Sequence, residues 1–329
     1  MSSDAVRPTY SFVVPVFNEE ATLGALYERL SAVLERLDGP SEVILVDDGS
    51  SDRSPELLRA VNARDPRFKV VVFSRNFGHQ VAVSAGIDMT VGDAVVIIDA
   101  DLQDPPEIVL EMAQRWREGW EVVYGVRRER AGESLFKLAT ASIFYRLLNR
   151  LTDVQMPLDV GDFRLIDRKA VEAFKLMPER NRYVRGMIAW IGFRQTGVEY
   201  MRAERYAGET KYPVKRMLKF AVNAIVGFSQ LPLRIALALG FVVAGAAFAG
   251  GVAAVALKAT GAYVVPGWAS IVAVIGLLGG VQLMVMGMLG VYIGRMYEEV
   301  KRRPLYIVRE THGLARDAPT GRTAGSTTL

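Results

Sequence analysis

Two carboxylates and an amide follow an apolar, β-branched stretch of the chain. Asp99 and Asp101 come after residues 94–98, and Gln103 stands two places beyond Asp101. Carboxylate and amide oxygens at the end of a buried strand suit a hard divalent cation, Mg²⁺ or Mn²⁺, which also accepts phosphate oxygens. Strand-end aspartates also cap the helix that follows. The Asp-x-Asp pattern alone therefore leaves both a metal site and a helix cap open.

Polar residues suited to binding a nucleotide follow three further β-branched stretches. Asp47 and Asp48 can accept hydrogen bonds from a base or a ribose, and Arg75 can pair with a phosphate. Each has a structural alternative, because an Asp-Gly pair is typical of a turn and an arginine also pairs with a neighbouring carboxylate. The polar residues over 17–20, which follow the stretch over 10–16, can equally be the start of a helix. His79 is interpreted as solvated or structural.

The elements that position these residues alternate between strands and helices. The sequence predicts strands over 10–16, 42–46, 69–73, 94–98 and 122–125, and helices over 21–37, 54–64, 80–89 and 106–118. This alternation is typical of a parallel sheet covered on both faces. Ligands of open α/β sheets bind at the carboxyl ends of the strands. The polar clusters are therefore expected to line one cleft.

Two long apolar stretches without charged residues lie in the last third of the chain. One runs from Arg234 to Lys258 and the other from Lys258 to Arg295. Each exceeds the roughly 20 residues that cross a hydrocarbon core of about 30 Å. Buried helices of a soluble core rarely run so long without a polar face. Transmembrane helices are predicted over 233–257 and 268–293.

Amphipathic and unpatterned segments flank these spans. Residues 212–230 are predicted to form a juxtamembrane helix at the bilayer interface, and residues 133–152 either a second interfacial helix or one packed on the soluble domain. The catalytic domain is expected over 1–211. The last segment, 295–329, is expected to be a partly disordered tail.

Basic residues flank the spans, while the connector between them has only Lys258 at its edge. They are Lys211, Lys215, Arg216, Lys219 and Arg234 before the first span, and Arg295, Lys301, Arg302 and Arg303 after the second. Positive charge is retained on the cytoplasmic side. The sequence thus predicts a multi-pass inner (plasma) membrane protein whose catalytic domain and both termini are cytoplasmic. Anionic headgroups explain the net charge of +4 more simply than nucleic-acid binding does. The absence of cysteine excludes disulfides and thiolate metal sites.

Six motifs in order resemble those of the family 2 glycosyltransferases, and within them the polyprenyl-phosphate glycosyltransferases, such as bactoprenol glucosyltransferases and dolichyl-phosphate mannose synthase. The motifs are Val14-Pro15-Val16-Phe17-Asn18-Glu19-Glu20, Val46-Asp47-Asp48-Gly49-Ser50, Ser74-Arg75-Asn76-Phe77-Gly78, Asp99-Ala100-Asp101-Leu102-Gln103, Gly161-Asp162-Phe163-Arg164-Leu165 and Gly208-Glu209-Thr210-Lys211-Tyr212. The resemblance runs from about residue 10 to 303. It implies a GT-A fold and metal-dependent, inverting transfer of a sugar from a nucleotide sugar to a lipid phosphate.

The resemblance also implies a role for each matching residue. The nucleoside would be held by Pro15, Phe17, Glu19, Asp47 or Asp48, and the Mg²⁺ or Mn²⁺ ion by Asp99, Asp101 and Gln103. Asp162 matches the acidic catalytic position. Because two phosphate groups must meet at the reacting carbon, cations are needed around them. The candidates are Arg127, Lys137, Arg202, Arg205 and Lys211.

The sequence looks closest to enzymes that use UDP-glucose and undecaprenyl phosphate, with GDP-mannose as the alternative donor. A processive polysaccharide synthase would need more spans and a Gln-x-x-Arg-Trp motif, which is absent around Trp190. An aspartyl phosphotransferase usually carries its Asp-x-Asp after the first strand, and here the pattern follows the fourth. A non-catalytic membrane scaffold would not need Asp99, Asp101 and Asp162. Small residues over 240–251 would let spans pack closely, so a homo-oligomer is compatible with the sequence.

Overall fold

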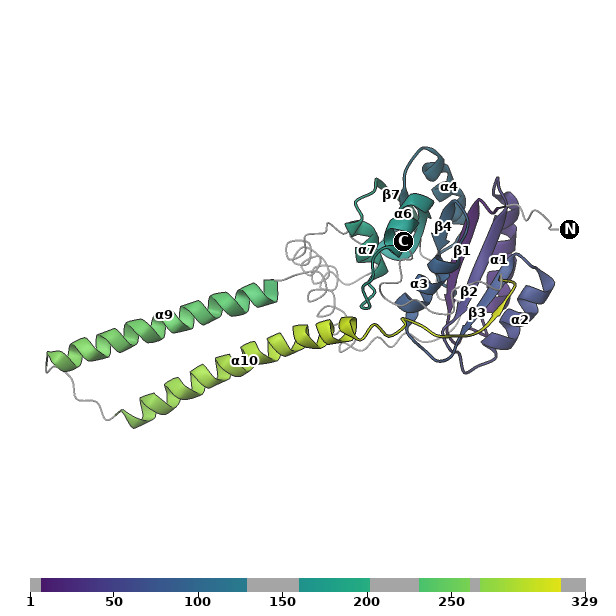
Figure 1. Ribbon diagram of the computed structural model, residues 1–329. Coiled ribbons are helices and arrows are strands. Elements are labelled where there is room, and N and C mark those ends of the chain that lie inside the picture. Colours follow the sequence, from purple (N-terminus) through teal and green to yellow (C-terminus); the bar gives the residue numbers. More distant parts are fainter. Residues whose placement is uncertain (1–6, 129–159, 202–230, 261–266, 315–329) are drawn as a thin grey trace. The chain divides into compact units, whose positions relative to one another are not determined.

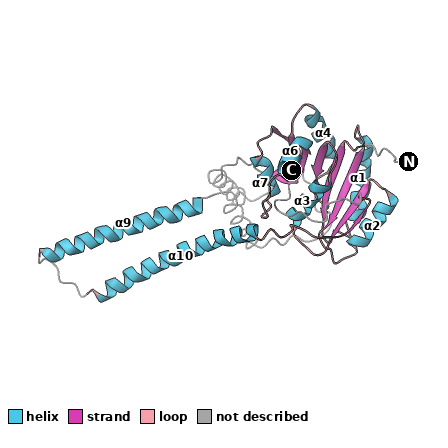
Figure 2. Ribbon diagram, in the orientation of Figure 1, coloured by secondary structure: helices cyan, strands magenta, loops and turns pink. Residues whose placement is uncertain are grey.

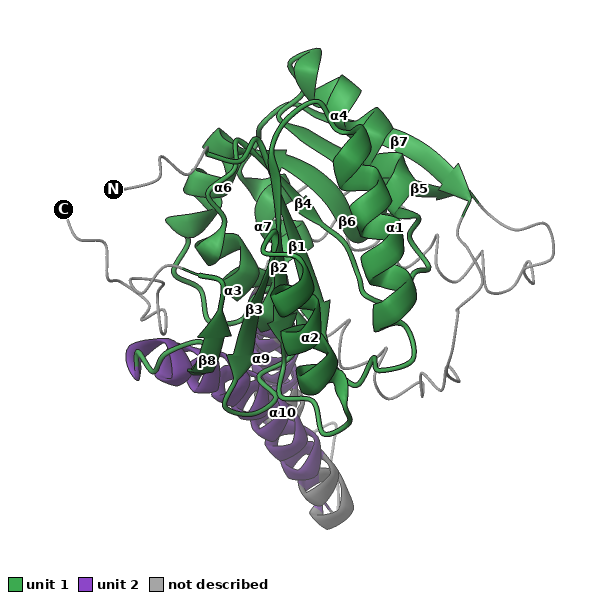
Figure 3. Cartoon of the chain, turned by 90° about the vertical axis from the view of Figure 1, so that its right-hand side faces the viewer, with its two compact units in different colours: residues 1–149, 154–213, 302–329 green, residues 150–153, 214–301 purple. Residues whose placement is uncertain are grey.

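The computed structural model describes residues 7–128, 160–201, 231–260 and 267–314 (Figure 1). The chain divides into two compact units, shown in green and purple in Figure 3. The first holds residues 1–149, 154–213 and 302–329, and the second holds residues 150–153 and 214–301. The predicted helices over 133–152 and 212–230 lie outside the described residues.

The first unit is built on an eight-stranded mixed sheet (Figure 2) with the strand order β7-β5-β6-β4-β1-β2-β3-β8. Its strands are β1 (Tyr10–Val16), β2 (Ser41–Asp47), β3 (Phe68–Phe73), β4 (Ala94–Ile97), β5 (Val122–Arg128), β6 (Val160–Asp167), β7 (Gln195–Met201) and β8 (Val308–His312). The four strands β1 to β4 are mutually parallel, whereas β6 and β8 run antiparallel to their neighbours β4, β5 and β3. The prediction of a mostly parallel sheet is confirmed.

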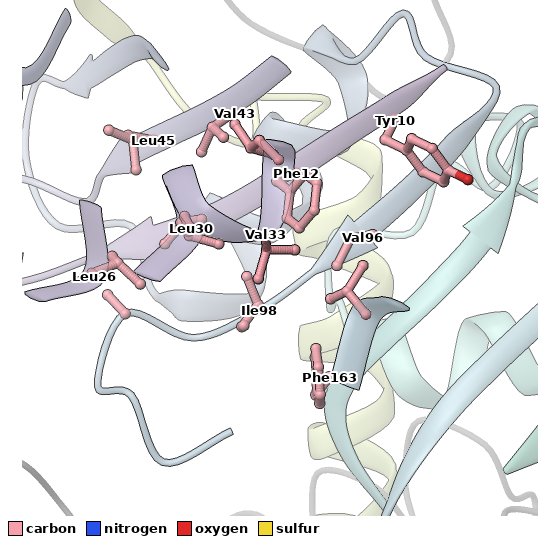
Figure 4. Packing of buried hydrophobic residues seen from close by; sticks show 14 of the residues in the cluster. Tyr10, Phe12, Leu26, Leu30, Val33, Val43, Leu45, Val96, Ile98 and Phe163 are labelled. Atoms are coloured by element: carbon pink, nitrogen blue, oxygen red, sulfur yellow. The ribbon is translucent and has the colours of Figure 1, made fainter. Parts of the chain in front are cut away.

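Helices cover both faces of this sheet. They are α1 (Leu23–Arg36), α2 (Ser54–Arg64), α3 (His79–Met89), a 3₁₀ turn (Pro106–Ile108), α4 (Val109–Arg117), α6 (Arg168–Lys175) and α7 (Val184–Trp190). Alternate residues of the central strands point to opposite faces. On one face Phe12, Val43 and Leu45 pack against Leu26, Leu30 and Val33 of α1 (Figure 4). On the other face Ile44, Val46 and Val71 pack against α3. Both faces are therefore apolar, which explains the continuous β-branched runs in the sequence.

The chain returns to the sheet after its last long helix, within the segment 295–329 that was expected to be a partly disordered tail. Leu305 and Tyr306 are buried beside β3, and the ring of Tyr306 stacks on Phe73 with centroids 5.3 Å apart. The strand β8 then pairs antiparallel with β3. The apolar run over 305–308 is only four residues long and the rest of β8 is polar, so no periodicity in the sequence marks this edge strand.

The second unit contains two long apolar helices, α9 (Leu231–Ala259) and α10 (Trp268–Val300). Within them, Ala236–Ala253 and Val274–Val300 each have a mean hydropathy of 2.0. Large side chains such as Phe241 and Phe248 are more than 70% exposed in the single chain. Exposed apolar surface over this length suits a hydrocarbon environment. Both helices are candidate membrane spans, and α10 continues seven residues beyond its predicted end at 293.

The contact between Tyr306 and Phe73 leads to a stability prediction. Replacing Tyr306 by Ala removes a fully buried ring, which destabilises a domain by about 3 kcal/mol. The thermal unfolding midpoint of the detergent-purified chain should fall by roughly 6–12 °C. Ile307→Ala is the matched control, because this neighbouring side chain is 52% exposed, and its midpoint should stay within about 2 °C. Equal shifts in the two variants would contradict the docking of this segment on β3.

Candidate active site

The insertion of β6 between β4 and β5 brings two distant aspartates together. In the antiparallel register Ile97 lies opposite Arg164, so two residues further on Asp162 reaches the level of Asp99. His79, the first residue of α3, lies between them. Its Nε2 atom is 3.5 Å from Asp99 Oδ1 and 3.5 Å from Asp162 Oδ2. The sequence, which indicates a solvated or structural role for His79, does not reveal these two contacts, because they depend on the end of β6 lying beside α3.

Asp162 is held from three directions. Gln80 Nε2 donates to its Oδ2 atom at 2.9 Å, and Arg185 Nη2 donates to its Oδ1 atom at 3.3 Å. Arg164 donates to the backbone carbonyls of Gly161 and Asp162 at 2.9 and 3.2 Å. Burial by itself raises the pKa of Asp162, but the hydrogen bond from His79 and the charges of Arg185 and Arg164 lower it far below its ordinary value. Asp162 is thus an ionised carboxylate fixed in position.

His79 has a raised pKa in this setting. Burial opposes its charged form, but the hydrogen bond to Asp162 and the charges of Asp99 and Asp162 outweigh burial and raise the pKa of His79 to about 9. The imidazole is therefore cationic at neutral pH. It adds a positive charge between the two carboxylates.

Asp99 has the properties of a cation ligand. Its Oδ1 atom is buried and accepts no hydrogen bond from the described residues, and its contact with His79 Nε2 is a 3.5 Å ion pair. Burial and the nearby carboxylates raise its pKa to about 6 against the attraction of His79. Two residues away, Asp101 Oδ1 accepts the N–H of Gln103 at 3.1 Å, and Leu102 between them has a φ of 58°. A divalent cation would satisfy the buried oxygen of Asp99, so the residues fit such an ion.

A cation here would need ligands from outside the protein. Across the described residues, no three His, Cys, Asp or Glu side chains gather into a group that could hold a metal ion. Hard divalent cations commonly complete their shell with water and substrate phosphate oxygens. The donor set therefore suits an ion that binds together with a phosphate-bearing ligand.

Arg127 is partly buried and forms an ion pair with the buried carboxylate of Asp104. Its Nη2 atom is 3.3 Å from an oxygen of Asp104, which also accepts a hydrogen bond from the Tyr200 hydroxyl. Its guanidinium covers Gly161, where a Cβ atom would come within 2.6 Å of Nη2. Arg127 therefore ties the segment after β4 to β5, β6 and β7, and Asp104 already balances its charge.

The two aspartates at the end of β2 have different partners. Asp48 accepts the N–H groups of Phe77 and Gly78 at 2.6 and 2.9 Å, one on each oxygen. Asp47 Oδ1 accepts the N–H of Ser50 at 3.2 Å, and its buried Oδ2 has no hydrogen-bond partner among the described residues. Burial raises the pKa of Asp47. Asp48 thus fastens the loop after β3, while Asp47 keeps an unsatisfied oxygen.

The other predicted nucleoside-binding residues gather at the neighbouring strand ends. Pro15 pairs with Val46 near the ends of β1 and β2. Phe17 follows β1 with its ring 45% exposed. The loops after β1 and β2 are joined by a hydrogen bond from the N–H of Ser51 to Asn18 Oδ1 at 2.8 Å. Glu19 Oε2 accepts the hydroxyl of Thr22 at 3.0 Å.

The loop after β3 completes this edge of the sheet. Arg75 lies over the ring of Phe77, with its Cζ atom 3.9 Å from the centroid, and donates to the carbonyl of Asn76 at 2.9 Å. Gly49 has a φ of 72°, and a Cβ atom there would come within 2.5 Å of the Arg75 carbonyl carbon. Only glycine allows the loops after β2 and β3 to approach this closely. Four further predicted site residues, Lys137, Arg202, Arg205 and Lys211, lie outside the described residues.

Comparison with known proteins agrees with this architecture. Residues 11–174 match the family described as Glycosyl transferase family 2. A Bacillus subtilis protein described as the uncharacterized glycosyltransferase YkcC is 49% identical over 93% of this chain and 94% of its own. The chain belongs to the family 2 glycosyltransferases.

Two further likenesses come from this comparison. The prophage bactoprenol glucosyl transferase homolog of Escherichia coli is 40% identical to this glycosyltransferase over 91% of the chain and 98% of its own length. Glucosyl-3-phosphoglycerate synthase from Mycobacterium tuberculosis, solved with Mn²⁺, UDP-glucose and phosphoglyceric acid, is 24% identical with a TM-score of 0.44, covering 68% of this chain and 78% of that chain.

Several site residues of this glycosyltransferase were missed from its sequence. They are His79, Gln80, Asp104, Arg164, Arg185 and Tyr200. Arg164 is part of the motif Gly161-Asp162-Phe163-Arg164-Leu165 and Gln80 lies two residues after the motif that ends at Gly78, so their positions were the available signal. Arg185 belongs to a separate stretch, Arg182-Tyr183-Val184-Arg185. Which of its side chains faces the site depends on where α7 begins. Nothing in its local pattern distinguishes it from a solvated arginine.

The two hydrogen bonds accepted by Asp48 can be tested by hydrogen exchange. Asp48→Ala removes a charged acceptor from two backbone N–H groups, and each such bond contributes about 1.5–3 kcal/mol. The amides of Phe77 and Gly78 should exchange roughly ten- to a hundredfold faster in this glycosyltransferase. Asp52→Ala is the control, because Asp52 accepts the N–H groups of Glu20 and Ser54 instead. Unchanged exchange at Phe77 and Gly78 in Asp48→Ala would refute the fastening role.

Proposed function

We propose that this glycosyltransferase transfers glucose from UDP-glucose to a polyprenyl phosphate, with undecaprenyl phosphate as the natural acceptor class, and releases UDP. The supporting observation is the extent of the match to the E. coli bactoprenol glucosyl transferase homolog. It covers 91% of this chain and 98% of that protein, so it includes α9 and α10. A shared catalytic domain alone would leave these two helices unmatched.

The reaction is a displacement at the anomeric carbon of glucose. An oxygen of the acceptor phosphate forms the new bond, the bond to the β-phosphate of UDP breaks, and its electron pair leaves with UDP. Inversion follows because attack and departure occur on opposite faces of the ring. The acceptor phosphate is largely dianionic at neutral pH, since its second pKa is near 6. No proton has to be removed before attack.

Asp162 orients the reacting groups in this proposal instead of acting as an obligatory base. It is ionised, only 13% exposed, and held by Gln80 and Arg185. A carboxylate fixed in this way can accept a hydrogen bond from a sugar hydroxyl and keep the anomeric carbon in line. Asp99, on the other side of His79, lies toward the leaving diphosphate.

Asp99, Asp101 and Gln103 would hold a Mg²⁺ or Mn²⁺ ion at the end of β4. The buried, unsatisfied Oδ1 atom of Asp99 supports this assignment. The bound ion supplies positive charge that stabilises the diphosphate as it leaves. Arg127 acts indirectly, because its ion pair with Asp104 fixes the segment that carries these ligands.

The nucleoside would occupy the ends of β1, β2 and β3. The exposed ring of Phe17 offers a stacking surface, and the unsatisfied Oδ2 atom of Asp47 offers an acceptor for a base N–H. Pro15 and Glu19 shape the first turn, and Asp48 holds the third loop in place. Arg75, on the loop after β3, is proposed to bind a phosphate of the nucleotide. Lys137, Arg202, Arg205 and Lys211 are proposed to face the phosphates of donor and acceptor.

A bilayer location suits the acceptor. Each methylene removed from an apolar environment costs about 0.8 kcal/mol, so a polyprenyl chain stays in the membrane and its phosphate reacts at headgroup height. The sheet also supports the proposed topology. Strand β8, which follows both apolar helices, pairs with β3, which precedes them. An even number of crossings is needed for both to lie on one side, and the basic flanks assign that side to the cytoplasm.

Sugar transfer can be tested with purified full-length protein in detergent. Radiolabel should pass from UDP-glucose into undecaprenyl phosphate, cease on chelation of divalent cations, and return on addition of Mg²⁺ or Mn²⁺. GDP-mannose and UDP-N-acetylglucosamine serve as competing donors. Label entering the lipid only from GDP-mannose would replace glucose by mannose, and label in a water-soluble polymer would favour a processive synthase.

Asp162→Asn should lower kcat at least about a hundredfold, because it removes the charge that orients the reacting groups while keeping the side-chain shape. The KM for UDP-glucose should change little. Asp167→Asn is a matched control at the other end of the same strand, where Asp167 accepts the Trp116 N–H and the Lys169 backbone N–H. Full activity in Asp162→Asn, with a correctly folded protein, would remove Asp162 from the mechanism.

A further inference from the structure

Arg185 occupies a well-defined place at the start of α7. The N–H of Val184 donates to Gln80 Oε1 at 2.9 Å, and Gln80 Nε2 donates to Asp162 Oδ2 at 2.9 Å. One amide side chain therefore fixes the beginning of α7 against Asp162. Arg185, the next residue, then reaches Asp162 Oδ1 with its Nη2 atom at 3.3 Å. Its side chain is 21% exposed, so it is partly accessible to a ligand.

The charged groups of the site follow one another in a fixed order. Asp99 contacts His79, His79 contacts Asp162 through Oδ2, and Asp162 contacts Arg185 through Oδ1. The two oxygens of Asp162 thus face opposite ends of this series. Asp99 lies at the end assigned to the cation and the leaving diphosphate. Arg185 lies at the other end of the series, and in the transfer proposed above the nucleophile attacks from the face opposite the leaving diphosphate.

Two guanidinium groups, those of Arg164 and Arg185, stabilise the charge of Asp162, but only that of Arg185 is accessible to a ligand. Arg164 is 3% exposed, and its Nε and Nη2 atoms donate to the carbonyls of Asp162 and Gly161. Arg164 therefore compensates the buried carboxylate from within the sheet. A guanidinium carries five N–H donors in a planar fork, so Arg185 can hold Asp162 and a phosphate at the same time.

We propose that Arg185 binds the phosphate of the lipid acceptor and holds it beside Asp162, at the end of the site away from Asp99. This assignment rests on the transfer reaction proposed above. It gives Asp162 a second function, because the carboxylate fixes the arginine that fixes the nucleophile. The β-phosphate of the sugar nucleotide offers Arg185 the same chemistry, so the test must separate the two phosphates.

Steady-state kinetics of the full-length protein separate them. The substrates are UDP-glucose and a water-soluble C10 isoprenyl phosphate, and the variants are Arg185→Gln and Arg185→Lys. Arg185→Gln should raise the KM for the isoprenyl phosphate at least about tenfold, the factor expected for a lost charge-assisted hydrogen bond. The KM for UDP-glucose should stay within about twofold. Arg185→Lys should recover part of the acceptor affinity, because it keeps the charge but loses the fork.

Arg194→Gln is the matched control. Arg194 precedes the edge strand β7, is 63% exposed, and lies 3.6 Å from Glu121. Both KM values should be those of the unmodified chain. Thermal unfolding midpoints show whether each variant folds. If Arg185→Gln does not fold, Arg185→Lys is compared with the unmodified chain instead.

Two kinetic outcomes overturn the inference. A larger rise in the KM for UDP-glucose than for the acceptor would assign Arg185 to the donor diphosphate. A fall in kcat with both KM values unchanged would mean that Arg185 only balances the charge of Asp162 and does not bind the acceptor phosphate.

Calorimetric binding of the isoprenyl phosphate without donor makes the test independent of transfer. If the unmodified chain transfers no glucose but binds the isoprenyl phosphate at least about tenfold more tightly than Arg185→Gln does, the proposed function fails and the Arg185 site stands. Equal binding by the unmodified chain and Arg185→Gln overturns the site.

Discussion

Two carboxylates can lie close together in a buried site only where positive groups compensate them, because each ionised carboxylate loses its hydration on burial. Asp99 and Asp162 are brought into this situation by β6, which enters the sheet antiparallel between β4 and β5. The compensation comes from separate parts of the chain. His79 begins α3, Arg164 lies on β6 and Arg185 lies in the first turn of α7. The order of the strands and the start of two helices are therefore tied to one electrostatic requirement.

The remaining polar residues at this edge serve the same arrangement from further away. Asp48 holds the backbone of the loop that leads into α3, and so fixes the residue before His79. Asp104, Arg127 and Tyr200 join the segment after Asp101 to β5 and β7. Several carboxylates whose residue type suggests a ligand-binding role are thus already bound to other groups of the protein. Two buried carboxylate oxygens have no hydrogen-bond partner among the described residues: Asp47 Oδ2, and Asp99 Oδ1, which lies 3.5 Å from His79 Nε2.

The central sheet could be predicted from the sequence because its strands are buried on both faces. Continuous β-branched runs such as 94–98 have no other common explanation. Strands β6, β7 and β8 could not be predicted, since β6 contains Asp162 and Arg164 and the other two are edge strands with polar residues. Their pairing depends on neighbours far away in the chain. The contacts of Asp162 with Gln80 and Arg185 are long-range in the same way, so residue type and spacing could name Asp162 but not its partners.

The strand β8 has a consequence for biosynthesis. It is the last described strand of the chain, yet it covers the open edge of β3, a strand made before residue 74. A ribosome delivers β3 early and β8 only after both apolar helices have emerged. Until then β3 exposes a row of unpaired backbone groups, which can pair wrongly with another chain. Completion of the catalytic sheet therefore waits for synthesis of the membrane helices, so a chain that is cut short before α10 ends keeps an unfinished sheet.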